Sequence, residues 1–205
     1  LVRLVLAGPD PSSIQDDPEA HEVLAEIRDA YAALSTDLQE AIAVLLLPMS
    51  SPDQNALIVN ALQRCSDIIV QNSLREGFGL TVTEAMWKQA AVAGSSAAGL
   101  RQQIRPELDG CLLEDPEDRS EVARTLAALL RDQRRREAFG RSAQQRVHAQ
   151  CSGDRWDCDG RRALYSRLAL RATWRRRLLL DDLLKPEWPS GRRRFRTGAQ
   201  VSAAP

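Results

Sequence analysis

Short apolar runs alternate with segments of helical periodicity along the first 150 residues of the chain. Gly8 and Pro9 follow the first apolar run and Pro48 follows the second, as expected where strands end. The runs predict strands at residues 1–7, 43–47, 67–71, 91–93 and 111–113, and the segments between them predict helices at 17–34, 52–64, 79–89, 117–130 and 134–149. This order favours an α/β fold, in which helices cover both faces of a parallel sheet.

The alternation of strands and helices ends near residue 151. Residues 151–205 hold 13 Lys and Arg against 6 Asp and Glu, whereas the first 150 residues hold 15 against 22. We therefore predict one domain at residues 1–150 and a separate basic tail at residues 151–205. We expect a helix at about 161–184 and disorder from 185 onward. We interpret the Arg-rich tail as a solvated segment rather than as an arm for nucleic acid or membrane.

The overall composition excludes several classes of function. The net charge is zero, which favours neither a nucleic-acid partner nor a membrane surface. No apolar run approaches the roughly 20 residues needed to cross a bilayer. The four cysteines are scattered and the two histidines, His21 and His148, lie far apart, so we predict no metal site. We interpret the cysteines as reduced thiols and expect a cytoplasmic protein. The first residue, Leu1, lies inside an apolar run, which suggests a fragment of a longer protein.

The segment QNSLREGFGLTVTEAMWK, residues 71–88, is the strongest candidate for a site. Ligands of parallel α/β sheets bind beyond the carboxyl ends of the strands, and this segment follows a predicted strand. Gly77 and Gly79 form a turn that allows a ligand to approach the backbone. The first amides of the next helix have no partner within the helix, and with the helix dipole they favour a diphosphate.

Two carboxylates, Glu76 and Glu84, flank this turn with seven residues between them. Both could accept hydrogen bonds from the hydroxyls of a sugar. The alternatives are structural: Thr81 and Glu84 also fit a capping box, and Glu76 fits a solvated loop residue. A second segment, residues 94–99 (GSSAAG), could admit a sugar or could be a plain connection between a strand and a helix.

Residues 75–88, REGFGLTVTEAMWK, closely resemble the donor-site motif of family 4 retaining glycosyltransferases of the GT-B fold. The trehalose synthase group, which joins a nucleotide-activated glucose to free glucose, is the nearest in sequence. The segments LVLAGPD, NALIVNALQR and LRQQI…DGCLLEDPED are also similar to that group. The resemblance covers about residues 1–150. It implies a Rossmann-like doubly wound parallel sheet, the C-terminal donor-binding domain of a GT-B enzyme.

The resemblance also implies roles for residues of the candidate site. Glu76 would be the catalytic carboxylate that holds hydroxyls of the transferred glucose, and Glu84 would hold the ribose. A sugar-contacting loop would include Ala98 and Gly99, where the family usually has Gly-Gly. The remaining donor-binding residues would be Gly77, Phe78, Gly79, Leu80 and Thr81.

The reaction implied is retaining transfer of glucose from a nucleotide sugar to a sugar acceptor, with no cofactor beyond that substrate. The expected partners are a nucleoside diphosphate glucose and an acceptor, with no nucleic acid and no membrane, and a homodimer is left open. The sequence does not distinguish ADP from UDP. An acceptor-binding domain and the Arg and Lys that clamp the diphosphate are not recognised, so we expect this chain alone to be inactive. The alternatives are a trehalose phosphorylase that uses glucose 1-phosphate and a non-catalytic nucleotide-binding module.

Overall fold

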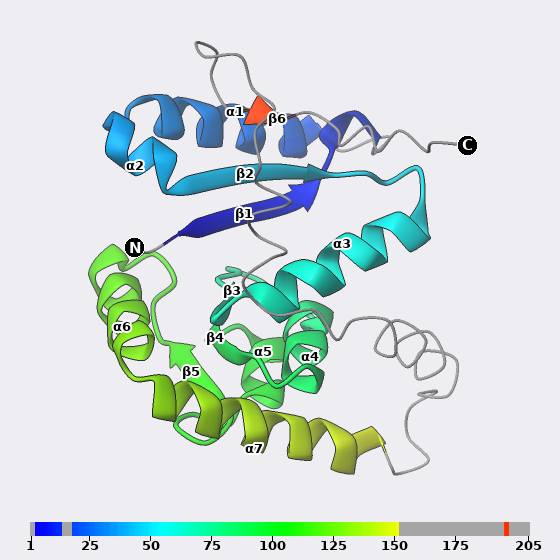
Figure 1. Cartoon of the computed structure of the whole chain (residues 1–205), viewed down its shortest axis with the longest axis vertical. Coiled ribbons are helices and arrows are strands. Elements are labelled where there is room, and N and C mark those ends of the chain that lie inside the picture. Colours follow the sequence, from blue (N-terminus) through cyan, green and yellow to red (C-terminus); the bar gives the residue numbers. More distant parts are fainter. Residues whose placement is uncertain (1–2, 14–17, 152–194, 197–205) are drawn as a thin grey trace. The chain divides into compact units, whose positions relative to one another are not determined.

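The computed structural model describes residues 3–13, 18–151 and 195–196 (Figure 1). These residues form two compact units, which are described separately. The first unit contains the described residues up to Val59 and residues 195–196, and the second begins at Asn60. The predicted helix at 161–184 and nearly all of the predicted disordered end lie outside the described residues. The predicted domain boundary at residue 150 stays a prediction.

The first unit is a parallel sheet of three strands with helices joining them. The strands are β1 (Leu4–Pro9), β2 (Ile42–Leu47) and the two-residue β6 (Phe195–Arg196), in the order β1-β2-β6. The helices are η1 (Pro11–Ser13), α1 (Pro18–Ala32), α2 (Thr36–Glu40) and the first part of α3 (Pro52–Cys65). Gln39 holds the connection between α1 and α2, because its amide donates to the carbonyls of Tyr31 and Leu34, each at 3.0 Å.

The first strand ends two residues later than predicted. We predicted that Gly8 and Pro9 end it, but Gly8 pairs with Leu46 and Pro9 with Leu47. Proline lacks an amide donor and is tolerated at the edge of a sheet, which is where β1 lies. The amide of Asp10 then donates to the Leu47 carbonyl at 3.2 Å, which closes the ladder.

The second unit is a three-layer α/β structure. Its strands are β3 (Ile68–Gln71), β4 (Ala91–Ser95) and β5 (Gly110–Leu113), all parallel and in the order β3-β4-β5. Its helices are α4 (Leu80–Trp87), α5 (Ala98–Gln103), α6 (Arg119–Arg131) and α7 (Gln133–Cys151), with the last part of α3. The central strand β4 is buried along its whole length.

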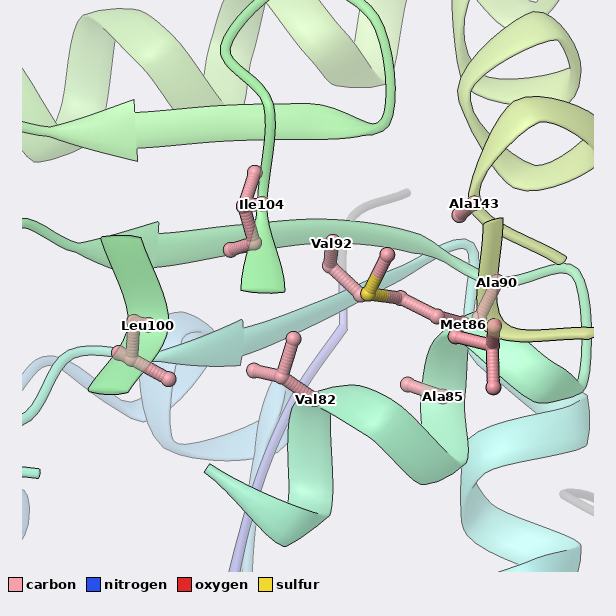
Figure 2. Packing of buried hydrophobic residues seen from close by; sticks show 9 residues of the cluster. Val82, Ala85, Met86, Ala90, Val92, Leu100, Ile104 and Ala143 are labelled. Atoms are coloured by element: carbon pink, nitrogen blue, oxygen red, sulfur yellow. The ribbon is translucent and has the colours of Figure 1, made fainter. Parts of the chain in front are cut away.

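Successive apolar side chains of β4 point to opposite faces of this sheet, and each contacts helices on its own face. Val92 belongs to a cluster with Val82 and Met86 of α4, and Figure 2 shows Met86 beside Val92. Ala93 belongs to a second cluster, which includes Leu129 of α6. Helices therefore cover both faces, as a doubly wound sheet requires, and the α/β class predicted from the sequence is confirmed.

Two features of the fold were not predicted. Helices α2 and α5 have only five and six residues, which is too short for a helical period to be recognised. The hydrogen bonds also group the described strands into two three-stranded sheets, where the alternation suggested one.

Candidate functional site

The carboxyl ends of β3 and β4 lie at the same edge of the second sheet. Gln71, the last residue of β3, pairs with Gly94, and Ser95 follows as the last residue of β4. The buried hydroxyl of Ser95 donates to the carbonyl of Ser73, in the segment that follows β3. This bond holds the start of the candidate segment against the sheet edge.

Residues 76–79, which we name the glycine turn, lead directly into α4. Gly79 is the N-cap of the helix, with a φ of 85° in the left-handed region. A side chain is strained at that φ, and an added Cβ would also lie 2.5 Å from Cδ2 of Leu100. The Gly79 carbonyl accepts from Val82 N and Thr83 N, each at 3.1 Å, so the helix starts here.

The first two residues of α4, Leu80 and Thr81, are exposed. Their amides occupy the first two helical positions, where a helix offers no internal acceptor. The positive end of the helix dipole adds to the field of these donors. The start of α4 therefore has the chemistry of an anion site, in the position predicted from the sequence.

Glu76 is bound to its own turn. Its Oε1 accepts from Phe78 N at 3.2 Å and from Gly79 N at 3.1 Å, and the residue is half-buried. The alternative that Glu76 is an ordinary solvated loop residue is therefore wrong. The carboxylate of Glu76 thus orders the turn by accepting from two of its amides.

Glu84 lies in the second turn of α4 and is half-buried. The capping-box alternative requires Thr81 to be the N-cap, but the N-cap is Gly79 and Thr81 lies inside the helix, so that alternative is wrong. One turn further along, Lys88 donates to the Gln63 side chain of α3. Burial lowers the pKa of Lys88 to about 8, against the effect of Glu84, which raises it.

The second predicted loop is partly helical. Ala98 and Gly99 are the first two residues of α5, not loop residues. Ala98 is exposed, whereas Gly99 is buried against the glycine turn and its amide donates to the Glu76 carbonyl at 2.9 Å. A Cβ on Gly99 would lie 2.5 Å from Phe78 N and 2.6 Å from the Gly77 carbonyl carbon. The glycine that this contact requires is thus Gly99, and a methyl group is accommodated at Ala98.

The sequence did not indicate two side chains that donate hydrogen bonds to backbone carbonyls of the site. Gln103 of α5 donates to the Phe78 carbonyl at 3.2 Å, and Gln63 of α3 donates to the Thr81 carbonyl at 3.3 Å. Both glutamines are buried, which is unusual for this residue type. The four-residue spacing of Gly99 and Gln103 is the signal that could have revealed Gln103, but only once α5 is known to be a helix.

The candidate site consists largely of backbone groups at the sheet edge. An open depression of about 550 Å³ lies elsewhere, where α6 meets α7, and its lining residues are Arg131, Asp132, Gln133, Arg134 and Glu137. Among the described residues no group of three or more His, Cys, Asp and Glu side chains could hold a metal ion. No helix in the described part of the chain is long and apolar enough to cross a bilayer.

A parallel α/β unit with a glycine turn and an exposed helix start defines a class of proteins that bind phosphorylated ligands at a sheet edge. Residues 3–146 match the family described as Glycosyl transferases group 1, and this chain belongs to that family. It is thus a glycosyltransferase domain of the GT-B fold.

The chain is similar to trehalose synthases. It is 46% identical to that of Thermococcus litoralis over 89 residues, 43% of this chain and 21% of the relative. It is 34% identical to that of Rubrobacter xylanophilus over 148 residues, 72% of this chain and 32% of the relative. The chain therefore spans between about a fifth and a third of the length of these relatives.

Solved structures confirm the fold. The sucrose-phosphate synthase (tll1590) from Thermosynechococcus elongatus superposes with a TM-score of 0.56 at 25% identity, over 72% of this chain and 34% of that one. The Anabaena protein Alr3699/HepE, solved in complex with UDP and glucose, gives a TM-score of 0.57 at 18% identity, over 71% of this chain and 35% of that one.

Proposed function

We propose that the glycine turn and the start of α4 bind a nucleotide sugar, and that the chain is the donor-binding half of a retaining glycosyltransferase of the trehalose-synthase type. The observation that carries this proposal is the exposed start of α4. It follows a left-handed Gly79 at the carboxyl edge of the sheet and presents the amides of Leu80 and Thr81.

The residues of the turn can contact three parts of the donor. The amides of Leu80 and Thr81 would donate to the diphosphate. Glu84, one turn along α4, would accept from the ribose hydroxyls. Oε1 of Glu76 accepts hydrogen bonds from amides of its own turn. The second carboxylate oxygen would accept from hydroxyls of the transferred sugar. There is room beside the turn, because a Cβ added to Gly77 would meet no atom within 4 Å among the described residues other than its chain neighbours.

The chemistry proposed is transfer with retention and without an enzyme nucleophile. The bond between the anomeric carbon and the phosphate oxygen breaks as the acceptor hydroxyl attacks from the same face, and the acceptor proton passes to the departing diphosphate. The domain would contribute positioning and stabilisation of the leaving group by backbone donors. Because the chain spans at most about a third of the trehalose synthases it matches, we expect no detectable trehalose formation by this chain alone.

The names of the similar proteins support this choice of donor. Four of the curated relatives are trehalose synthases, and one is a D-inositol 3-phosphate glycosyltransferase. HepE has been solved with UDP-glucose, so UDP-glucose is a suitable first probe, with ADP-glucose beside it. Glucose 1-phosphate is the third probe, because a phosphorylase would prefer it to either nucleotide sugar.

The replacement Glu84→Gln tests the role of Glu84. The amide keeps the size of the side chain but loses the charge that favours the paired ribose hydroxyls, so affinity for the nucleotide sugar should fall about tenfold. The melting temperature should stay within about 2 °C of wild type, because Glu84 does not cap the helix. The affinity is measured by NMR titration of the 205-residue chain.

Glu117→Gln provides the matched control, since Glu117 is an exposed residue that belongs neither to the glycine turn nor to α4. It should bind like wild type. Equal affinities in the two variants, with a lower melting temperature only for Glu84→Gln, would assign Glu84 a structural role.

A further inference from the structure

We propose that Gln103, at the end of α5, is a positioning residue for donor binding. It fixes the carbonyl of Phe78 and thereby keeps the glycine turn in the shape that presents the amides of α4. This inference rests on the proposed function of the turn. It adds a residue outside the donor-binding segment.

Helix α5 contacts the glycine turn at two points one helical turn apart. Near its start, the Gly99 amide donates to the Glu76 carbonyl at 2.9 Å. At its end, the Gln103 side chain donates to the Phe78 carbonyl at 3.2 Å. Residues four apart lie on the same face of a helix, so one face of α5 holds both carbonyls.

These two contacts fix the groups that the site uses. The Glu76 carbonyl belongs to the peptide unit that joins Glu76 to Gly77, and the Phe78 carbonyl to the one that joins Phe78 to Gly79, while the carboxylate of Glu76 accepts from the amides of Phe78 and Gly79. The turn is thus held by hydrogen bonds to the carboxylate of its own residue Glu76 and by two hydrogen bonds from α5. Release of the Phe78 carbonyl would remove one restraint on the peptide unit between Phe78 and Gly79, where the glycine has no side chain to limit the backbone.

Gln103 is itself rigidly held. Only 5% of it is exposed. Arg146 of α7 donates to its carbonyl at 3.0 Å and to the Gln102 carbonyl at 2.9 Å. The chain of hydrogen bonds therefore runs from α7 through the end of α5 to the turn. A buried residue held at its backbone carbonyl and at its side-chain amide suits a positioning role, because little freedom is lost when the donor binds.

The test compares Gln103→Met with Gln102→Met in the full 205-residue chain. Methionine keeps the volume of glutamine but cannot donate a hydrogen bond, and Gln102 is the exposed neighbour on the same helix. We expect affinity for UDP-glucose or ADP-glucose to fall about fivefold in Gln103→Met and to match wild type in Gln102→Met. In the free protein, the NMR chemical shifts of the Phe78 and Gly79 amides should change in Gln103→Met and stay at their wild-type values in Gln102→Met.

The comparison of affinity with melting temperature separates positioning from stability. Unchanged affinity in a folded Gln103→Met chain overturns the inference, even if its melting temperature falls. If that variant does not fold, Gln103→Glu replaces it, since a carboxylate of the same shape cannot donate at neutral pH. Wild-type affinity in that variant likewise overturns the inference. If the wild-type chain binds neither nucleotide sugar, the proposed function fails before the role of Gln103 is reached.

Discussion

Gly79 and Gly99 are needed for different physical reasons, although both border the same turn. Gly79 has a left-handed backbone that begins α4, whereas Gly99 has no such constraint and is required because α5 touches the turn backbone. Only the first requirement follows from the local sequence, in which a glycine stands where a strand turns into a helix. The second depends on a contact between segments some twenty residues apart.

The close approach at Gly99 predicts the effect of Gly99→Ala. Its Cβ would meet backbone atoms of residues 76–78, which cannot rotate away as a side chain can. We expect a loss of about 1–3 kcal/mol in the free energy of unfolding, together with weaker nucleotide-sugar binding. Urea unfolding measures the first effect and NMR titration the second. Ala98→Ser, at the exposed neighbouring position, should leave the free energy of unfolding unchanged, and wild-type stability in Gly99→Ala would show that α5 can move away without cost.

At the scale of helices and strands, a buried carboxylate connects two segments of the second unit. Asp109, just before β5, is 0% exposed in its side chain. It accepts from Arg105 at 2.6 and 2.8 Å and from Ser142 of α7 at 2.8 Å. Burial opposes its ionisation, but the hydrogen bonds from Arg105 and Ser142 outweigh burial and hold the pKa of Asp109 below its ordinary value of 3.8. The charge thus ties the segment before β5 to α7.

The replacement Asp109→Asn should lower the free energy of unfolding at pH 7 by about 2 kcal/mol, because the arginine loses its charged partner. A carboxylate with a depressed pKa in the folded state contributes fully above its unfolded value and less as the pH falls toward the folded value. The difference between wild type and variant should therefore shrink as the pH falls below about 4. Urea unfolding between pH 7 and pH 3 checks this. Asp115→Asn, at an exposed position, is the control, and a difference that grows in acid would contradict the account.

The elements show why the sequence predicted the fold better than the site. β4 begins with a short apolar run, and apolar residues recur every four positions in α7 at Phe139, Ala143 and Val147, so these elements could be placed within a few residues. Helix α5 has six residues and a glycine in its first turn, so its sequence gives no helical period. Without a helical period over α5, the sequence predicts that Gly99 lies in a loop and gives no role to Gln103. The turn itself was predicted correctly, since two closely spaced glycines directly after a predicted strand indicate a turn.

At the scale of the whole molecule, the residues named for the candidate site all belong to the second unit. The strand β3, the glycine turn, α4 and α5 all lie within residues 60–185, as do Gln63 and Arg146, which support them. We therefore expect donor binding to depend on this unit's own fold. Affinity should be modest, because the turn offers neutral amides whose hydrogen bonds each contribute about 0.5–1.5 kcal/mol net.

The most direct test of this account is an NMR titration of the isotope-labelled 205-residue chain with UDP-glucose and, separately, ADP-glucose. We predict saturable shifts that are largest at the amides of Gly79, Leu80 and Thr81, with a Kd in the millimolar range. These amides lie at the positive end of the α4 helix dipole, where the glycine turn leads into the helix. Shifts confined to the arginine-rich residues beyond 151, or no saturable shift with either nucleotide sugar, would contradict the assignment of the donor site.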